Sequence, residues 1–189
     1  MIKTLFCAAL CLSMASAPTV QASSGSKLSL SREQYSSIGQ RIWKNECAGT
    51  VEGLTAWNKG EEFMSLGIGH FIWYPKGKDY GFDESFPKFV QFAASRGYKL
   101  PGVLLGKNPA CPWNSRQEFQ AAFNSAEMKS LRAFLKDTVT LQAEFIARRL
   151  EASLPKILAA APASQRADIE KNSTKSRRPP AACMPSWIM

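Results

Sequence analysis

The chain has 189 residues, and its 24 lysines and arginines against 15 aspartates and glutamates give a formal net charge of +9. One histidine and five cysteines without a Cys-x-x-Cys pair exclude the usual zinc-site patterns, so we expect neither a metal nor another cofactor. No nucleic-acid-binding motif accompanies the positive charge, and we expect no nucleic-acid partner.

The first 22 residues have the pattern of a secretory signal peptide. Lys3 supplies the positive charge, residues 5–14 form an apolar run, and Val20-Gln21-Ala22 places small residues before a cleavage position at Ser23. The apolar run is too short to span a membrane, and no later segment could do so. We therefore expect an exported protein, periplasmic or secreted. Its basic charge suits an anionic polymer such as a cell-wall glycan, although it can also serve solubility alone.

The remaining residues are enough for one domain with a hydrophobic core. Residues 23–30 are small and polar, and they predict a mobile lead. Ser31 and Gln34 have the spacing of a capping box and predict the start of a helix. Its apolar face comprises Tyr35, Ile38, Ile42 and Trp43.

Glu46 lies on that same face, at the C-terminal end of the predicted helix. The negative end of the helix dipole and the apolar neighbours both disfavour an ionised carboxylate. This environment suits a residue that donates a proton during catalysis. The alternative is a solvated glutamate at a helix end.

Residues 48–75 predict turns and short strands. Asn58-Lys59-Gly60 is a plausible hairpin turn between residues 54–57 and 62–66. Further along, Gly67 and Gly69 permit a positive φ or the close approach of a substrate to the backbone.

An apolar run follows the glycines and ends at Pro75. We expect Phe71 and Ile72 in the core. Three aromatic residues are candidates for stacking on a sugar, although each also fits the core: Trp57, Trp73 and Tyr74.

The rest of the chain is mainly helical. One predicted helix starts at Asp83 or Ser85 and ends near Gly97, and another starts with a capping box at Ser115. Asn124-Ser125 separates this helix from the next. A further helical stretch begins at Thr138 and is interrupted at Pro155. The sequence thus predicts a helix-rich α+β domain with a small β-hairpin.

The segment from Arg41 to Trp73 resembles the active-site region of phage-type lysozymes. In that family a catalytic glutamate ends a helix, and a β-hairpin leads to a Thr-Ile-Gly-Ile-Gly-His-like run. Residues 65–70, Ser-Leu-Gly-Ile-Gly-His, are similar to that run. The resemblance implies a lysozyme-like domain over residues 31–171 that cleaves peptidoglycan or a related polysaccharide, as a lysozyme or a lytic transglycosylase. The alternative is a non-catalytic envelope protein of that fold that binds a glycan or a protein.

The resemblance also implies roles for individual residues. Glu46 would protonate the glycosidic oxygen, Glu62 or Glu61 would be the second carboxylate, and Ser65 would orient a water. The family places an aspartate between the glutamate and the threonine, whereas no aspartate lies between Glu46 and Ser65 here. The identity of the second carboxylate, and the choice between water attack and internal cyclisation, therefore remain open. We expect His70 to be structural.

Three cysteines follow the signal sequence: Cys47, Cys111 and Cys183. An exported protein can form disulfides, and a Cys47–Cys111 bond would fix the residue after Glu46. The alternative is a pair of buried thiols. The sequence predicts no oligomeric state.

Residues 172–189 differ from the preceding sequence, because helical patterning gives way to basic residues and prolines. One interpretation is a disordered tail. Another interpretation is a change of reading frame. In the shifted frame each new codon takes the third base of one original codon and the first two bases of the next. Met184-Pro185 must then encode Ala and Trp187-Ile188 must encode Asp, and the flanking codons permit Gly-Gly-Leu-Tyr-Ala-Leu-Met-Asp-Tyr. We therefore hypothesise a one-base frameshift near residues 171–173.

Overall fold

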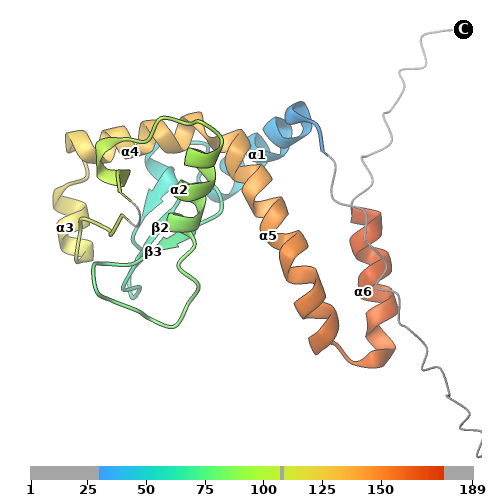
Figure 1. The fold of residues 1–189 in the computed structure, drawn as a ribbon. Coiled ribbons are helices and arrows are strands. Elements are labelled where there is room, and N and C mark those ends of the chain that lie inside the picture. The colour runs from blue at the N-terminus through green and yellow to red at the C-terminus, as the bar shows by residue number, and fades with distance from the viewer. Residues whose placement is uncertain (1–29, 107–108, 177–189) are drawn as a thin grey trace, which may run out of the picture.

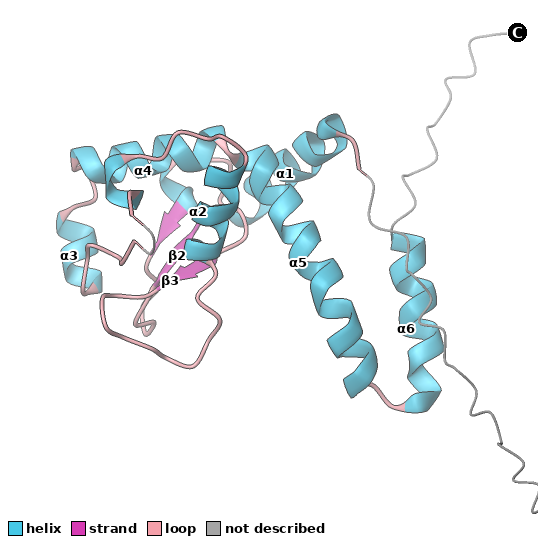
Figure 2. Ribbon diagram, viewed as in Figure 1, coloured by secondary structure: helices cyan, strands magenta, loops and turns pink. Residues whose placement is uncertain are grey.

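The computed structural model describes residues 30–106 and 109–176, in which a small antiparallel sheet lies within a mainly helical body (Figure 1). The helices are α1 (Arg32–Glu46), α2 (Phe86–Ser95), α3 (Arg116–Ala121), α4 (Ala126–Asp137), α5 (Val139–Ala160) and α6 (Ala163–Ser176), with 3-10 helices η1 (Glu52–Leu54) and η2 (Gly102–Leu104). The strands are β1 (Thr55–Ala56), β2 (Met64–Leu66) and β3 (Phe71–Trp73). The expected helix-rich α+β class is confirmed (Figure 2).

The sheet has the order β1-β2-β3, with both pairs antiparallel. Strands β1 and β2 form the hairpin that the sequence predicts. The third strand was not predicted, because its three residues follow one another in an unbroken apolar run. In the structure Ile72 is half-buried between two fully buried neighbours. Burial therefore alternates along β3 as is typical of a strand, although all three residues are apolar.

The two faces of the sheet differ in character. One face packs into the core with side chains that are almost fully buried: Met64, Leu66, Phe71 and Trp73. The register aligns Ala56, Ser65 and Ile72 in a row across the other face. We call this row the outer row, because it carries the smaller and less deeply buried side chains.

Aromatic rings join the sheet to the helices. The Trp73 and Phe86 ring centroids lie 4.9 Å apart, and the rings of Phe71 and Phe89 stack with centroids 5.1 Å apart. Phe71 therefore lies in the core as expected, whereas Ile72 lies in the half-buried outer row.

The outer edge of β3 is covered by the chain that leads into α2. The backbone N–H of Ile72 donates to Ser85 Oγ at 3.0 Å, and that of Tyr74 donates to Glu84 Oε1 at 2.8 Å. Side chains thus satisfy two donors that an unpaired edge strand would expose.

Helix α1 begins as the sequence predicts and packs against α5. Ser31 Oγ accepts from the N–H of Gln34, and Gln34 Oε1 accepts from the N–H of Ser31 at 2.7 Å, which completes the capping box. Gly39 lies where the two helices approach each other. A Cβ atom there would lie 2.9 Å from the carbonyl oxygen of Val139, so this close approach needs glycine.

Two predicted boundaries are wrong. Helix α5 continues through Pro155 to Ala160, because the proline removes only one N–H donor and lies in an exposed stretch that projects from the body (Figure 1). Helix α6 then turns back beside α5 and includes residues 172–176, which the sequence assigned to an aberrant tail.

Residues 1–29, with the predicted signal peptide and most of the lead, and residues 177–189 lie outside the described residues. Among the described helices, none is long and apolar enough to cross a membrane.

Candidate functional site

Glu46 is the last residue of α1, and its side chain is 57% exposed. A carboxylate oxygen, Oε2, lies 3.9 Å from Nε2 of His70, whose side chain is 45% exposed. Ile38 and Ile42 of α1 line the same groove as Glu46, so the apolar face expected beside this residue is present, although the carboxylate itself is exposed to solvent. His70 is thus an exposed neighbour of the candidate acid.

Open space adjoins this carboxylate. A groove of about 350 Å³ runs along α1 and ends at Glu46, with Gln34, Arg41 and Asn45 among its lining residues. The side chain can thus be reached by a large ligand.

Hydrogen bonds fix the end of α1 against the sheet. The backbone N–H groups of Cys47 and Gly49 both donate to the carbonyl of Trp43, and the Trp43 indole donates to the carbonyl of Thr50 at 2.8 Å. The Cys47 thiol lies 3.8 Å from the carbonyl oxygen of Gly67, directly after β2. Glu46 is thereby held beside the turn that joins β2 to β3.

That turn is built around Gly67 and a buried glutamine. Gly67 has φ +67°, and a Cβ atom there would overlap the side chain of Gln142. The Gln142 oxygen accepts from the N–H of Ile68 at 2.8 Å, and its nitrogen donates to the carbonyl of Leu135 at 2.6 Å. A Cβ atom on Gly69 would lie 2.6 Å from the Phe71 ring. Packing of the chain on itself thus explains both glycines, without a substrate against the backbone.

Ser65 lies in the middle of the outer row, two residues before Gly67. It is paired on one side with Ala56 and on the other with Ile72. Ser65 is buried, and it lies two residues before Gly67, the first residue of the turn that Glu46 adjoins.

Glu62 lies at the opposite end of β2, near the hairpin turn. At roughly 3.3 Å per residue, the five steps from Glu62 to Gly67 span up to about 16 Å. Paired carboxylates in glycosidases lie only about 5–9.5 Å apart. Glu62 thus lies before β2, whereas Glu46 lies beside the turn that follows this strand. Glu61 belongs to the turn itself, since it accepts from Asn58 Nδ2 at 3.0 Å and from the Trp57 indole through its backbone carbonyl.

The three aromatic residues considered for sugar stacking are buried: Trp57, Trp73 and Tyr74. The Trp73 indole N–H donates to the carbonyl of Pro109 at 2.9 Å, and the Trp57 ring packs near Phe119. The structure therefore assigns these rings to the core, which corrects the stacking hypothesis. Buried aromatic faces are not available to a ligand.

A different aromatic cluster, formed by Phe63, Tyr74 and Phe82, was not predicted from the sequence. Phe63 directly precedes β2, and its ring centroid lies 5.9 Å from those of Tyr74 and Phe82. Phe82 is 61% exposed. The Tyr74 hydroxyl accepts from the Phe82 N–H at 2.9 Å and donates to the Phe82 carbonyl at 2.8 Å, so the backbone of this exposed residue is held firmly.

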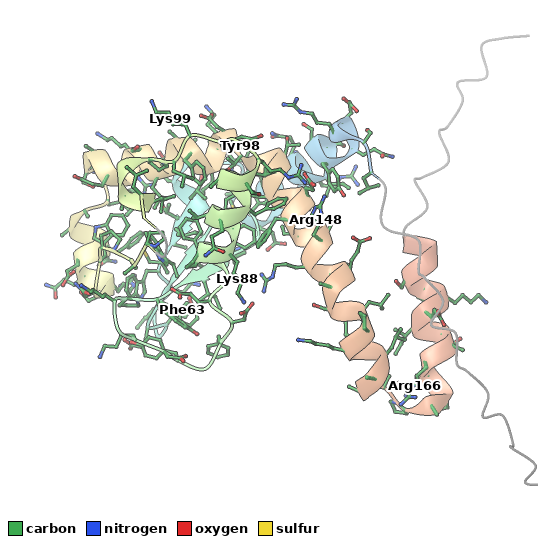
Figure 3. All side chains as sticks on the ribbon, in the orientation of Figure 1. Phe63, Lys88, Tyr98, Lys99, Arg148 and Arg166 are labelled. Carbon is green, nitrogen blue, oxygen red and sulfur yellow. The ribbon has the colours of Figure 1, made fainter. Side chains whose placement is uncertain are left out.

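Figure 3 shows Phe63 beside the loop that leads to α2. Its spacing from Ser65 is a signal that sequence reasoning could have used. No local pattern points to Phe82, because the folding of the loop over Tyr74 determines its place.

Of the two alternatives for Cys47 and Cys111, the structure has the pair of free, buried thiols and no disulfide between them. Cys47 contacts Gly67, whereas the Cys111 thiol lies 3.2 Å from the carbonyl oxygen of Trp113. Burial raises the pKa of Cys47, and it raises the pKa of Cys111 to about 12. Cys183 lies outside the described residues.

Within residues 30–106 and 109–176, no group of three or more His, Cys, Asp or Glu side chains could hold a metal ion. No protein-family model, curated protein or solved structure matches this chain.

Proposed function

We propose that this protein is an exported enzyme that cleaves the glycan chains of peptidoglycan, with Glu46 as the proton donor. One observation carries the proposal. The carboxylate of Glu46 stands in open space at the end of α1, beside the turn that follows Ser65. Together with the signal-like first 22 residues, this supports a wall polysaccharide as substrate.

In the proposed reaction Glu46 gives its proton to the glycosidic oxygen while the bond from that oxygen to the sugar carbon breaks. Because Glu62 lies at the far end of β2, a second nearby carboxylate is not part of the proposal. The attacking group is a water or a hydroxyl of the substrate itself. Its oxygen bonds to the sugar carbon and its proton returns to Glu46, which restores the acid. The Ser65 hydroxyl would orient the attacking group.

The exposure of Glu46 sets a condition on this reaction. An exposed carboxylate is in contact with bulk water, so the bound glycan itself must cover Glu46 and exclude water before the proton moves. Such covering favours a polymer that fills the groove along α1.

The cluster of Phe63 and Phe82 adjoins the start of β2, since Phe63 directly precedes this strand. Exposed aromatic faces suit the apolar C–H faces of sugar rings, and a residue whose backbone is held by hydrogen bonds, as that of Phe82 is, loses less conformational freedom on binding. We propose that part of the glycan lies against this cluster while the cleaved bond lies at Glu46.

Release of soluble fragments from purified peptidoglycan tests the proposal. We expect the chain from residue 23, or the same chain with the reading frame restored, to release fragments. Glu46→Gln should abolish this release with unchanged circular dichroism, because the side chain is exposed. Glu62→Gln is the matched control and should retain activity. The fragment masses distinguish reducing ends, made by water, from anhydro ends, made by internal attack.

Two outcomes contradict the proposal. Full activity in Glu46→Gln would show that Glu46 is not the proton donor. No release by either folded form of the chain, together with retention on peptidoglycan, would favour the non-catalytic binding protein instead.

A further inference from the structure

A polar groove of about 440 Å³ lies at the start of α1, where this helix meets α5 and the chain that follows α2. We call it the arginine groove, and its polar lining residues are Arg32, Tyr35, Arg96, Tyr98, Thr140 and Glu144. Arg32 and Glu46 are the first and last residues of the 15-residue helix α1, so about 21 Å of helix separates them. The arginine groove and the groove beside Glu46 share Leu30 but no polar lining residue. The two grooves are therefore distinct places on the molecule.

Arg96 is held in place at this groove. Its Nη2 donates to Glu144 Oε1 at 2.5 Å, and its guanidinium lies 4.9 Å from the centre of the Phe92 ring. The same carboxylate oxygen accepts from Arg148 Nε at 2.9 Å. Two guanidinium groups thus share Glu144 and offset its negative charge. A bound anion could therefore use the remaining N–H groups of Arg96 with little opposition from this carboxylate.

The other polar groups of the groove offer donors that the protein itself leaves unused. Within the part of the chain that the structure describes, the Arg32 guanidinium and the hydroxyls of Tyr35, Tyr98 and Thr140 form no hydrogen bond or ion pair. Burial, followed by the nearby Glu144 and Glu151, raises the pKa of Tyr35, so its hydroxyl keeps its proton and can donate. Figure 3 shows Tyr98 close to the start of α5, with Arg148 further along the same helix.

This set of donors suits an anion with several acceptor oxygens. The donors come from three segments, namely α1, the chain just after α2 and the first turns of α5. A carboxylate offers two oxygens in one plane, whereas a phosphate monoester offers three oxygens arranged around phosphorus and carries more negative charge. The volume of the groove is in the range of small-molecule sites, so it can hold more than the phosphate alone.

We propose that the arginine groove binds a small phosphate monoester, such as a sugar phosphate. The phosphate would lie between Arg32 and Arg96, and the organic part would lie beside the Tyr35 and Tyr98 rings. Two further carboxylates, those of Glu33 and Glu151, lie near these groups, but neither lines the groove. Because the groove is at the other end of α1 from Glu46, this inference is independent of glycan cleavage.

Titration calorimetry of the purified chain with glucose 6-phosphate, at constant ionic strength, tests the proposal. We expect saturable binding, with no binding of glucose and weaker binding of gluconate, which carries a carboxylate instead. Arg32→Gln should weaken the binding of glucose 6-phosphate at least about tenfold, because it removes a charge-assisted contact. Arg32 is exposed, so circular dichroism should be unchanged. Arg41→Gln is the matched control, since Arg41 is also exposed on α1 but lines the groove beside Glu46, and it should bind like the parent.

Tyr98→Phe separates a specific site from general attraction between a basic protein and an anion. It removes one hydroxyl and no charge, and we expect binding to weaken roughly three- to tenfold. Equal losses in Arg32→Gln and Arg41→Gln would overturn the proposal, as would full affinity in both Arg32→Gln and Tyr98→Phe. Absence of glucose 6-phosphate binding by the folded chain would also overturn it. If that chain instead bound vesicles of phosphatidylglycerol, the groove would face a membrane surface and not a small ligand.

Discussion

The side-chain oxygen of Gln142 accepts a hydrogen bond from the backbone N–H of Ile68 at 2.8 Å, across 74 residues of chain. The same carboxamide donates to the carbonyl of Leu135 and to the hydroxyl of Thr138. One buried side chain thus joins the α4–α5 corner to the turn beside Glu46. The position of the candidate acid relative to the helices depends on this contact.

Replacing Gln142 by leucine should destabilise the protein. The volume is similar, but the N–H of Ile68 would be buried without a partner, and we expect the free energy of unfolding to fall by about 2–3 kcal/mol. Urea unfolding followed by circular dichroism measures this. Gln40→Leu is the control, because Gln40 is exposed on α1. Equal stability of the two variants would show that the buried contact contributes little.

Gly67 and Gly60 offer a matched pair for separating backbone strain from steric overlap. Both have a positive φ, but a Cβ atom on Gly60 would meet nothing within 4 Å, whereas one on Gly67 would overlap Gln142. We expect Gly60→Ala to cost about 1 kcal/mol and Gly67→Ala more than about 2 kcal/mol. Thermal unfolding of both variants measures the difference, and a Gly67→Ala variant as stable as Gly60→Ala would exclude the overlap.

The buried thiol of Cys111 should make stability depend on alkaline pH. Its pKa is about 12 in the folded protein against an ordinary value of 9.0, so between these values the unfolded chain releases a proton that the folded chain keeps. Stability is therefore fully present below about pH 9 and falls as the pH rises toward 12, by up to about 1.4 kcal/mol per pH unit. Urea unfolding at several pH values measures the slope.

Cys111→Ala should have a smaller slope in the same pH range, since the titrating group is gone. Identical slopes would show that the thiol does not contribute. A reducing agent should leave the stability of the parent chain unchanged, because neither Cys47 nor Cys111 is in a disulfide.

Phe82→Ala tests the aromatic cluster that the proposed function uses. Because the Phe82 ring is 61% exposed, we expect folding to be unchanged and binding to peptidoglycan to weaken by roughly five- to tenfold. Co-sedimentation with insoluble peptidoglycan measures the affinity. Leu105→Ala removes an equally exposed apolar side chain elsewhere and should bind normally. A Phe82→Ala variant that binds like the parent would place the glycan away from this cluster.

Local chemistry in the sequence was enough to predict several elements. Ser31 and Gln34 fix the start of α1, Ser115 caps α3 through the N–H of Glu118, and Asn58-Lys59-Gly60 lies in the loop between β1 and β2. Each of these signals involves residues a few positions apart, so no knowledge of the tertiary structure is needed.

Features that depend on distant contacts could not be predicted in this way. Gln142 carries no local sign of its hydrogen bond to Ile68, and the exposure of Glu46 depends on where α5 lies. The same holds for Trp73, whose apolar ring suits a ligand or a core equally well until its neighbours are known. The candidate acid could thus be named from the sequence, but its surroundings could not.

The cover over the outer edge of β3 also limits what this sheet can join. The two N–H groups that a foreign strand would need, those of Ile72 and Tyr74, already donate to Ser85 and Glu84. A peptide could extend the sheet there only by displacing the start of α2. We therefore expect that any partner of this protein recognises side chains and does not bind as an added strand along β3.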